Sequence, residues 1–269
     1  MKELENTQQQ KSCKILLVGD SCVDKFHYGV CERISPEAPV PIFKHMNTEV
    51  KNGMCLNVEQ NLKAFKFAEI SVLTNTEKIT KERFVDINSG QHLLRTDFGE
   101  NKKINHLPSS RITKDLILQY DYVIISDYNK GFITENVAEK ILNICKRLSI
   151  PVFVDSKKTN LSCFNGAYIK INQKEYLQID KKSVNMSMLI VTKGKHGCIW
   201  DGKVFPTDMV EVSDVSGAGD TFLSSLVYGI YKHKDITKAI KIANKCSSFV
   251  VQRSGTYALG EEDVEELCI

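Results

Sequence analysis

Short, continuously apolar runs alternate along this chain with longer segments whose apolar residues recur at helical spacing. In one such segment Val58, Leu62 and Phe65 fall on a single helix face. The apolar runs predict strands at residues 14–20, 69–74, 121–128, 151–157, 166–172 and 188–206. The last of these ranges is predicted to hold several strands separated by glycine turns. The helical spacing predicts helices, the second with Thr134 as a plausible N-cap, at residues 57–68, 133–148, 220–232 and 235–253.

Continuously apolar strands are typical of parallel sheets that are covered on both faces. Their alternation with helices predicts an α/β fold with a doubly wound, mostly parallel sheet and helices on both faces. Prolines at 36, 39 and 41 exclude a helix there, and Asn88-Ser89-Gly90 indicates a hairpin. We therefore expect one domain over 13–269, with a small β lid formed by segments of about 25–50 and 82–105.

Composition and charge exclude several classes of protein. The 269 residues carry a formal net charge of only +3, which gives no argument for a nucleic-acid or membrane partner. Residues 1–12 are polar, lack an apolar signal core and are predicted to be a disordered leader. The nine cysteines include no C-x-x-C pair and are expected to be buried thiols in a reducing cytoplasm.

Polar residues stand at the carboxyl ends of the predicted strands, where parallel sheets gather their sites. They are Asp20, Asp127, Asp155, Asn172 and Thr192. These side chains mark one edge of the sheet as the candidate site.

The stretch DVSGAGDTF, residues 214–222, places small residues and an aspartate before a helix. In one interpretation Asp220 only caps the helix. In the other, the amides of Gly217, Ala218 and Gly219 bind an anion at the positive end of the helix, and Asp220 accepts a proton. The stretch lacks the Gly-Lys-[Ser/Thr] ending of a P-loop, so a Walker-type ATPase is not indicated.

DVSGAGDTF resembles the signature of the ribokinase-like carbohydrate kinases. The resemblance extends in consistent order over about 13–265, through KILLVGDSCVD (14–24), GMCLNVEQNL (53–62), KINQKE (170–175) and VTKGKHG (191–197). RISPEAPVPIFK (33–44), ISDYNKGFIT (125–134) and FVDSKK (153–158) further resemble the heptose 7-phosphate kinases. Those kinases correspond to one half of a bifunctional enzyme of ADP-heptose synthesis, which supplies a precursor of the lipopolysaccharide core. With a chain of 269 residues we expect only that half.

The resemblance implies a cytoplasmic kinase that uses ATP and Mg²⁺, with a monovalent cation as a further hypothesis. Asp220 would be the catalytic base, and Gly217, Ala218 and Gly219 would form the anion hole. The residues implied on the nucleotide side, with Glu175 also as an indirect metal contact, are Asn172, Glu175, Thr192, Gly194, Asn244 and Gly255. The residues implied on the sugar side are Asp20, Asp24, Gly53, Asn57, Asp127, Lys130 and Lys157. Arg95 and Asp97 are expected either to reach the substrate or to pair with each other.

Two departures from the family pattern stand out. The glycine-rich segment reads Gly53-Met54-Cys55-Leu56-Asn57, and its bulky side chains would obstruct a sugar. About 30 residues, one supersecondary unit, are missing after Thr74. Two alternatives to a heptose kinase therefore stay open: a kinase for another sugar or sugar phosphate, and a catalytically weak paralogue that binds sugar or nucleotide. A homodimer formed through the lid strands is a separate hypothesis.

Overall fold

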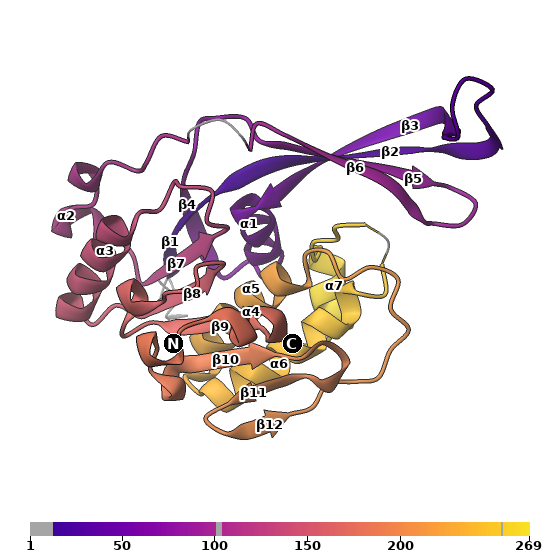
Figure 1. The fold of residues 1–269 in the computed structure, drawn as a ribbon. Coiled ribbons are helices and arrows are strands. Elements are labelled where there is room, and N and C mark those ends of the chain that lie inside the picture. The colour runs from indigo at the N-terminus through magenta and orange to yellow at the C-terminus, as the bar shows by residue number, and fades with distance from the viewer. Residues whose placement is uncertain (1–12, 101–103, 254) are drawn as a thin grey trace, which may run out of the picture.

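The computed structural model describes residues 13–100, 104–253 and 255–269 of the chain. The predicted leader at 1–12 lies outside this described part, as do positions 101–103 of the lid segment. An eight-stranded sheet forms the body of the molecule, and a four-stranded sheet projects from it as a lid (Figure 1).

The body sheet has the strand order β12-β11-β10-β9-β8-β7-β1-β4. Pairs from β10 to β4 are parallel, whereas β11 and β12 are added antiparallel. The predicted α/β class with a mostly parallel sheet is thus confirmed. Its strands are β1 (Cys13–Gly19), β4 (Ala68–Thr74), β7 (Tyr122–Asp127), β8 (Val152–Ser156), β9 (Tyr168–Asn172), β10 (Leu189–Thr192), β11 (Cys198–Trp200) and β12 (Lys203–Phe205).

Helices cover both faces of this sheet. In β1, Leu16 and Val18 pack into the cluster that contains α3, whereas Ile15 and Leu17 pack into the cluster that contains α1, α5 and α6. The helices are α1 (Cys55–Ala64), α2 (Lys114–Ile117), α3 (Glu135–Leu148), α4 (Gln173–Gln178), α5 (Ala218–His233), α6 (Ile236–Val250) and α7 (Glu261–Glu266). Short 3-10 turns are η1 (Ser109–Arg111), η2 (Ser162–Phe164), η3 (Lys181–Ser183), η4 (Met186–Met188) and η5 (Gly194–His196).

The lid sheet has the order β3-β2-β5-β6. Its strands are β2 (Ser21–Ile34), β3 (Pro41–Met54), β5 (Thr80–Asp86) and β6 (His92–Phe98). Parallel pairing places Asp24 of β2 beside Lys81 of β5, and Phe26 beside Arg83. Because alternate residues of a strand share a face, these four side chains lie on one side of the lid.

Some helix boundaries differ from those predicted. Helix α1 begins at Cys55 and ends at Ala64, because the chain turns through a positive φ of 52° at Lys66. Phe65 then stacks on Tyr228 and Phe67 meets the same ring edge-on rather than continuing the helix, so the predicted end at 68 was wrong. The Thr134 side chain accepts a hydrogen bond from the Val137 amide, which confirms the predicted cap of α3.

Strand β4 lies at one end of the body sheet, where β1 is its neighbour in the described part of the chain. Residues 75–79 then connect it directly to the lid strand β5. The predicted gap after Thr74 would therefore fall at the edge of the body sheet, next to β4.

The contact between α5 and α6 supplies the first testable prediction. A Cβ atom at Gly229 would lie 2.5 Å from the Cα of Ala239, so this helix pair requires a glycine. We expect Gly229→Ala to lower the free energy of unfolding by roughly 1–3 kcal/mol, because overpacking outweighs the better helix propensity of alanine. Urea unfolding measures the change, with Asn143→Ala on the exposed side of α3 as control. Unchanged or raised stability would contradict the prediction.

Candidate active site

The turn that opens helix α5 is fixed by a glycine. Gly217 is the N-cap residue and has a positive φ of 85°. A Cβ atom there would lie 2.9 Å from the Asn57 amide nitrogen and 3.1 Å from the Thr256 methyl group. The first amides of a helix have no partner within it and lie at its positive end. The turn therefore presents an anion-binding surface.

Asp220 lies in the first turn of α5 and is only 4% exposed. Its two carboxylate oxygens accept hydrogen bonds of 2.8 Å, one from the Asn57 amide and one from the Tyr128 hydroxyl. Burial raises the pKa of Asp220 to about 6, although both hydrogen bonds favour the charged form. The side chain does not cap the helix, so the capping interpretation of Asp220 was wrong.

Three cavities adjoin this turn, with volumes of about 370, 700 and 160 Å³. We call them the lid cavity, the central cavity and the apolar cavity. Gly217 and Asp220 line the first two, whereas Ala218 and Gly219 line the last two. One helical turn therefore borders all three spaces.

The lid cavity combines cations with carboxylates. Its charged lining residues are Asp24, Lys81, Arg83, Arg95, Lys130, Lys157 and Asp220. Arg83 pairs with Asp24 at 2.6 Å, and Lys81 and Lys130 both reach Glu100. Arg95 and Asp97 pair with each other through two hydrogen bonds, which confirms one of the two expectations, and Arg95 also lines the cavity.

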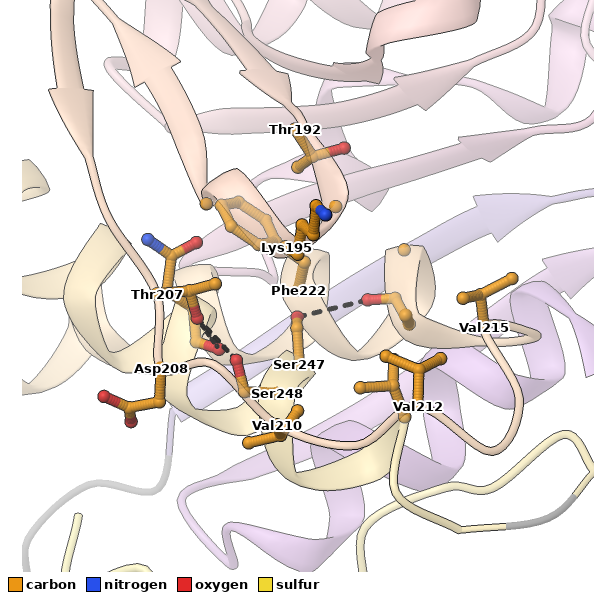
Figure 2. A pocket seen from close by; sticks show the side chains of 16 residues that line it. Thr192, Lys195, Thr207, Asp208, Val210, Val212, Val215, Phe222, Ser247 and Ser248 are labelled. Atoms are coloured by element: carbon orange, nitrogen blue, oxygen red, sulfur yellow. Dashed lines mark hydrogen bonds between the residues drawn. The ribbon is translucent and has the colours of Figure 1, made fainter.

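The apolar cavity lies between α5, α6 and the irregular segment 207–215 that precedes them (Figure 2). Figure 2 shows Val210, Val212 and Val215 beside it, with Phe222 on α5. Thr192 and Gly194 line both this cavity and the central one, where the sequence placed the nucleotide. Asn244 also lines it, but its amide donates to the Phe205 and Pro206 carbonyls.

The Asn-x-x-Glu motif forms a capping box at the start of α4. The Asn172 side chain accepts from the Glu175 amide at 2.9 Å, and Glu175 accepts from the Asn172 amide at 2.7 Å. Glu175 also pairs with Lys157, which borders both the lid and the central cavity. The motif thus fixes the Glu175 carboxylate next to the Lys157 ammonium group, just after the carboxyl end of β9.

Asp20 and Asp127 were also placed on the sugar side by the resemblance. Both are almost fully buried, and neither lines a cavity described above. Asp20 accepts from the backbone amides of Lys130 and Phe132, and Asp127 accepts from Lys158 and Ser156. Both carboxylates also hold the loop that carries Tyr128, and neither lines the lid cavity, so their place on the sugar side stays a prediction.

Two predicted glycines also have structural surroundings. A Cβ atom at Gly53 would lie 2.3 Å from Asp24, so the glycine makes room for that carboxylate. Gly255 lies against Phe26 and Lys51 of the lid and not in the apolar cavity with Asn244, whereas the sequence placed both residues on the nucleotide side. Met54 does line the lid cavity, as its bulk suggested.

Sequence reasoning missed several residues of the site. Tyr128 contacts Asp220, and Lys170 pairs with Asp155 under the α5 turn. Lys81 and Arg83 reach the lid cavity from β5. The sequence did carry a signal for Lys170. It places a charge inside the otherwise apolar strand 166–172, and such a charge is costly to bury unless it is paired.

Within the described ranges, no group of three His, Cys, Asp or Glu side chains is arranged to hold a metal ion. No helix among these residues has the length and apolar character needed to cross a membrane. All nine cysteines are free thiols, most of them buried as predicted, with Cys31 half-buried and Cys268 exposed.

A doubly wound sheet, a β lid and a helix N-terminus beside a buried carboxylate define a phosphotransferase of the carbohydrate kinase class. The profile of the pfkB family carbohydrate kinases matches residues 66–263. The chain therefore belongs to the pfkB family of carbohydrate kinases.

Curated relatives include two proteins named "Bifunctional protein HldE". The one from Campylobacter concisus is 32% identical over 305 residues, which cover 96% of this chain and 65% of that protein. The one from Sulfurimonas denitrificans is 31% identical, over 94% of this chain and 64% of that protein. The chain thus spans slightly less than two thirds of these relatives. An alignment of 305 positions exceeds the 269 residues here, so at least 36 positions have no counterpart in this chain.

Solved structures share the fold. Phosphofructokinase-2 from Escherichia coli, in complex with potassium, has a TM-score of 0.71 at 12% identity and covers 95% of this chain and 98% of its own. Arabidopsis thaliana ribokinase, complexed with ribose and ATP, has a TM-score of 0.67 at 12% identity with the same coverage. The predicted ribokinase-like fold is confirmed.

The contacts of Asp220 give a prediction that needs no substrate. We expect the Asp220 carboxyl to titrate with a midpoint near pH 6 in carbon-13 NMR. Tyr128→Phe should raise that midpoint, because a hydrogen bond to the charged form is lost. Tyr120→Phe, a partly buried tyrosine outside the cavities, is the control and should leave it unchanged. A midpoint near the ordinary aspartate value, or one that ignores Tyr128→Phe, would contradict the assignment.

Proposed function

We propose that this chain is an ATP-dependent kinase that phosphorylates the anomeric hydroxyl of heptose 7-phosphate to give heptose 1,7-bisphosphate. The observation that carries the proposal is the common border of three cavities at Gly217–Asp220. A sugar phosphate in the lid cavity and a nucleotide in the other two would meet at this turn, with the base between them.

Asp220 would act as the base. A carboxylate with a pKa near 6 is charged at neutral pH yet basic enough to accept a proton as the hydroxyl attacks. The hydroxyl oxygen bonds to the γ-phosphorus, the bond from that phosphorus to the bridging oxygen breaks, and ADP leaves. Tyr128 and Asn57 hold the carboxylate in position throughout. The amides of Ala218 and Gly219 lie where they would stabilise the charge on the transferred group.

The nucleotide would place its base in the apolar cavity and its phosphates in the central one. Valines and Phe222 suit a flat heteroaromatic ring, and Thr192 and Gly194 stand at the passage between the cavities. Asp155 and Glu175, both joined to Lys157, are the carboxylates that would hold a magnesium ion, which would neutralise phosphate charge there. Such an ion keeps most of its ligands as water and phosphate, which suits a site without a dedicated cluster.

The sugar proposal rests on charge and on relatives. Lys81, Arg83 and Arg95 line the lid cavity from β5 and β6, and Lys130 and Lys157 line it from the body. Ammonium and guanidinium groups are the natural partners of a phosphate. The HldE proteins are the relatives that favour a heptose phosphate over other phosphorylated sugars.

A catalytically weak binding protein is the second candidate. Met54 lines the lid cavity, and at least 36 aligned positions of the Campylobacter concisus relative have no counterpart in this chain. Such a protein would be stabilised by magnesium-ATP against heat and yet release no ADP with any sugar.

The oligomeric state and ion requirement complete the proposal. Edge strands β3 and β6 expose large apolar side chains, namely Met46, Val50, Leu93, Leu94 and Phe98, and we propose that they pair in a homodimer. A monomeric mass in light scattering would exclude it. Stimulation of turnover by potassium over choline chloride would establish the monovalent cation.

The direct test is ADP release with magnesium-ATP and heptose 7-phosphate, fructose 6-phosphate, ribose or fructose. We expect turnover with heptose 7-phosphate alone, and a loss of at least about 1000-fold in Asp220→Asn, because the base is removed. Asp235→Asn, which keeps a good N-cap at α6, is the control and should retain activity. Turnover with a different sugar would reject the heptose assignment, and full activity in Asp220→Asn would reject the base.

The cations of the lid cavity give a separate prediction. We expect Lys81→Met to raise KM for the sugar phosphate by roughly 10- to 100-fold, since a charge-assisted hydrogen bond to phosphate is lost. Lys25→Met is a matched control, because Lys25 belongs to the same lid sheet but pairs with Glu82 outside the cavity. Equal effects of the two substitutions would show that the lid acts by general charge and not by contact.

A further inference from the structure

Lys170 is a charged residue inside the body sheet. It lies on β9 between Asp155 of β8 and Ile190 of β10, and it is only 3% exposed. A charge in this setting is costly to bury, and apolar residues of similar volume are often at least as stabilising as a buried ion pair. The position therefore calls for a reason beyond stability.

The ammonium group of Lys170 lies under the first turn of α5. Its Nζ is 2.6 Å from the Asp155 carboxylate and would be 2.7 Å from a Cβ atom at Gly219. Lys170, Asp155 and Gly219 all line the central cavity. A cation at the positive end of a helix is unfavourable by itself, so this arrangement favours an anion in the cavity.

Asp155 holds Lys170 through one of its two carboxylate oxygens. One carboxylate oxygen bonds to Lys170, and the other is buried without a hydrogen-bond partner, 3.9 Å from Lys157. Burial opposes the charge of Asp155, but the two lysines outweigh it and lower its pKa. Lys157 is also paired with Glu175, so Lys170, whose ammonium group bonds to Asp155 alone among the carboxylates that the structure describes around it, is the cation that lies against the α5 N-terminus in this cavity.

We propose that Lys170 is a catalytic residue that donates a hydrogen bond to the γ-phosphoryl group of the bound nucleotide, and that Asp155 orients it. The inference rests on the proposed ATP-dependent reaction. Lys170 forms no covalent bond and releases no proton. It stabilises negative charge on the oxygens of the transferred group, beside the amides of Ala218 and Gly219.

The test compares the binding of two nucleotides, one that has a γ-phosphoryl group and one that lacks it. Calorimetry with magnesium measures the affinities for ADP and for the β,γ-imido analogue of ATP. We expect Lys170→Met to weaken binding of the analogue roughly 10- to 100-fold more than binding of ADP. Lys140→Met removes a partly buried lysine that bonds only the Ser109 carbonyl, and it should leave the ratio unchanged.

A second variant separates this contact from a structural role. Lys170→Met alone leaves the Asp155 charge buried without its partner and should lower the midpoint of thermal unfolding. The double variant with Asp155→Asn removes both charges and should restore the midpoint of the unmodified protein. We expect the double variant to keep the altered ratio of affinities and to remain at least about 100-fold slower in turnover than the unmodified enzyme. Recovery of the ratio together with the midpoint, or equal weakening of both nucleotides in Lys170→Met, would overturn the inference and leave the proposed function standing. If the unmodified protein binds neither nucleotide, the proposed function and the inference fail together.

Discussion

The site depends on one backbone constraint, the left-handed conformation of Gly217. This conformation turns the chain into α5 so that Ala218, Gly219 and Asp220 face three cavities at once. The Asn57 amide, which would touch any side chain at Gly217, is the same group that holds Asp220. The turn, the carboxylate and its partner on α1 are therefore a single packed unit, and a side chain added at Gly217 would disturb all of them. Close packing of α5 on α6 at Gly229 fixes the axis along which this unit points.

The sequence was sufficient for the parts of the fold that depend on local pattern. Continuous apolar runs identify the central strands because both faces of the sheet are covered, and the small residues of the signature identify the turn. Side chains at strand ends were harder to assign. Asp20 and Asp127 stand at such ends, yet they accept hydrogen bonds from backbone amides of the loop at 128–133, and only three-dimensional packing decides whether a carboxylate faces a cavity or a backbone amide. Tyr128 was missed for the same reason, because no spacing rule links it to Asp220.

The missing segment changes the edge of the sheet and not its centre. Strands β7, β8 and β9 carry Tyr128, Asp155 and Lys170 into the site through the loops and registers of the sheet interior. Strand β4 lies beyond β1, on the side away from β8 and β9. The predicted gap after Thr74 would fall beside β4, so it would expose backbone groups at that edge and leave the supports of the site in place.

Burial of the Asp220 carboxylate lowers the stability of the folded protein at neutral pH. The pKa of Asp220 rises from 3.8 to about 6, so the native state binds this proton more tightly than the unfolded chain does. Stability from this group is present below about pH 4 and is lost as the pH rises to about 6, which amounts to about 3 kcal/mol at neutral pH. Asn57, Tyr128 and Lys170 each favour the charged form and limit that loss. Because the same burial that lowers stability makes Asp220 a better base, replacing this carboxylate by a neutral group would relieve the cost and remove the proton acceptor together.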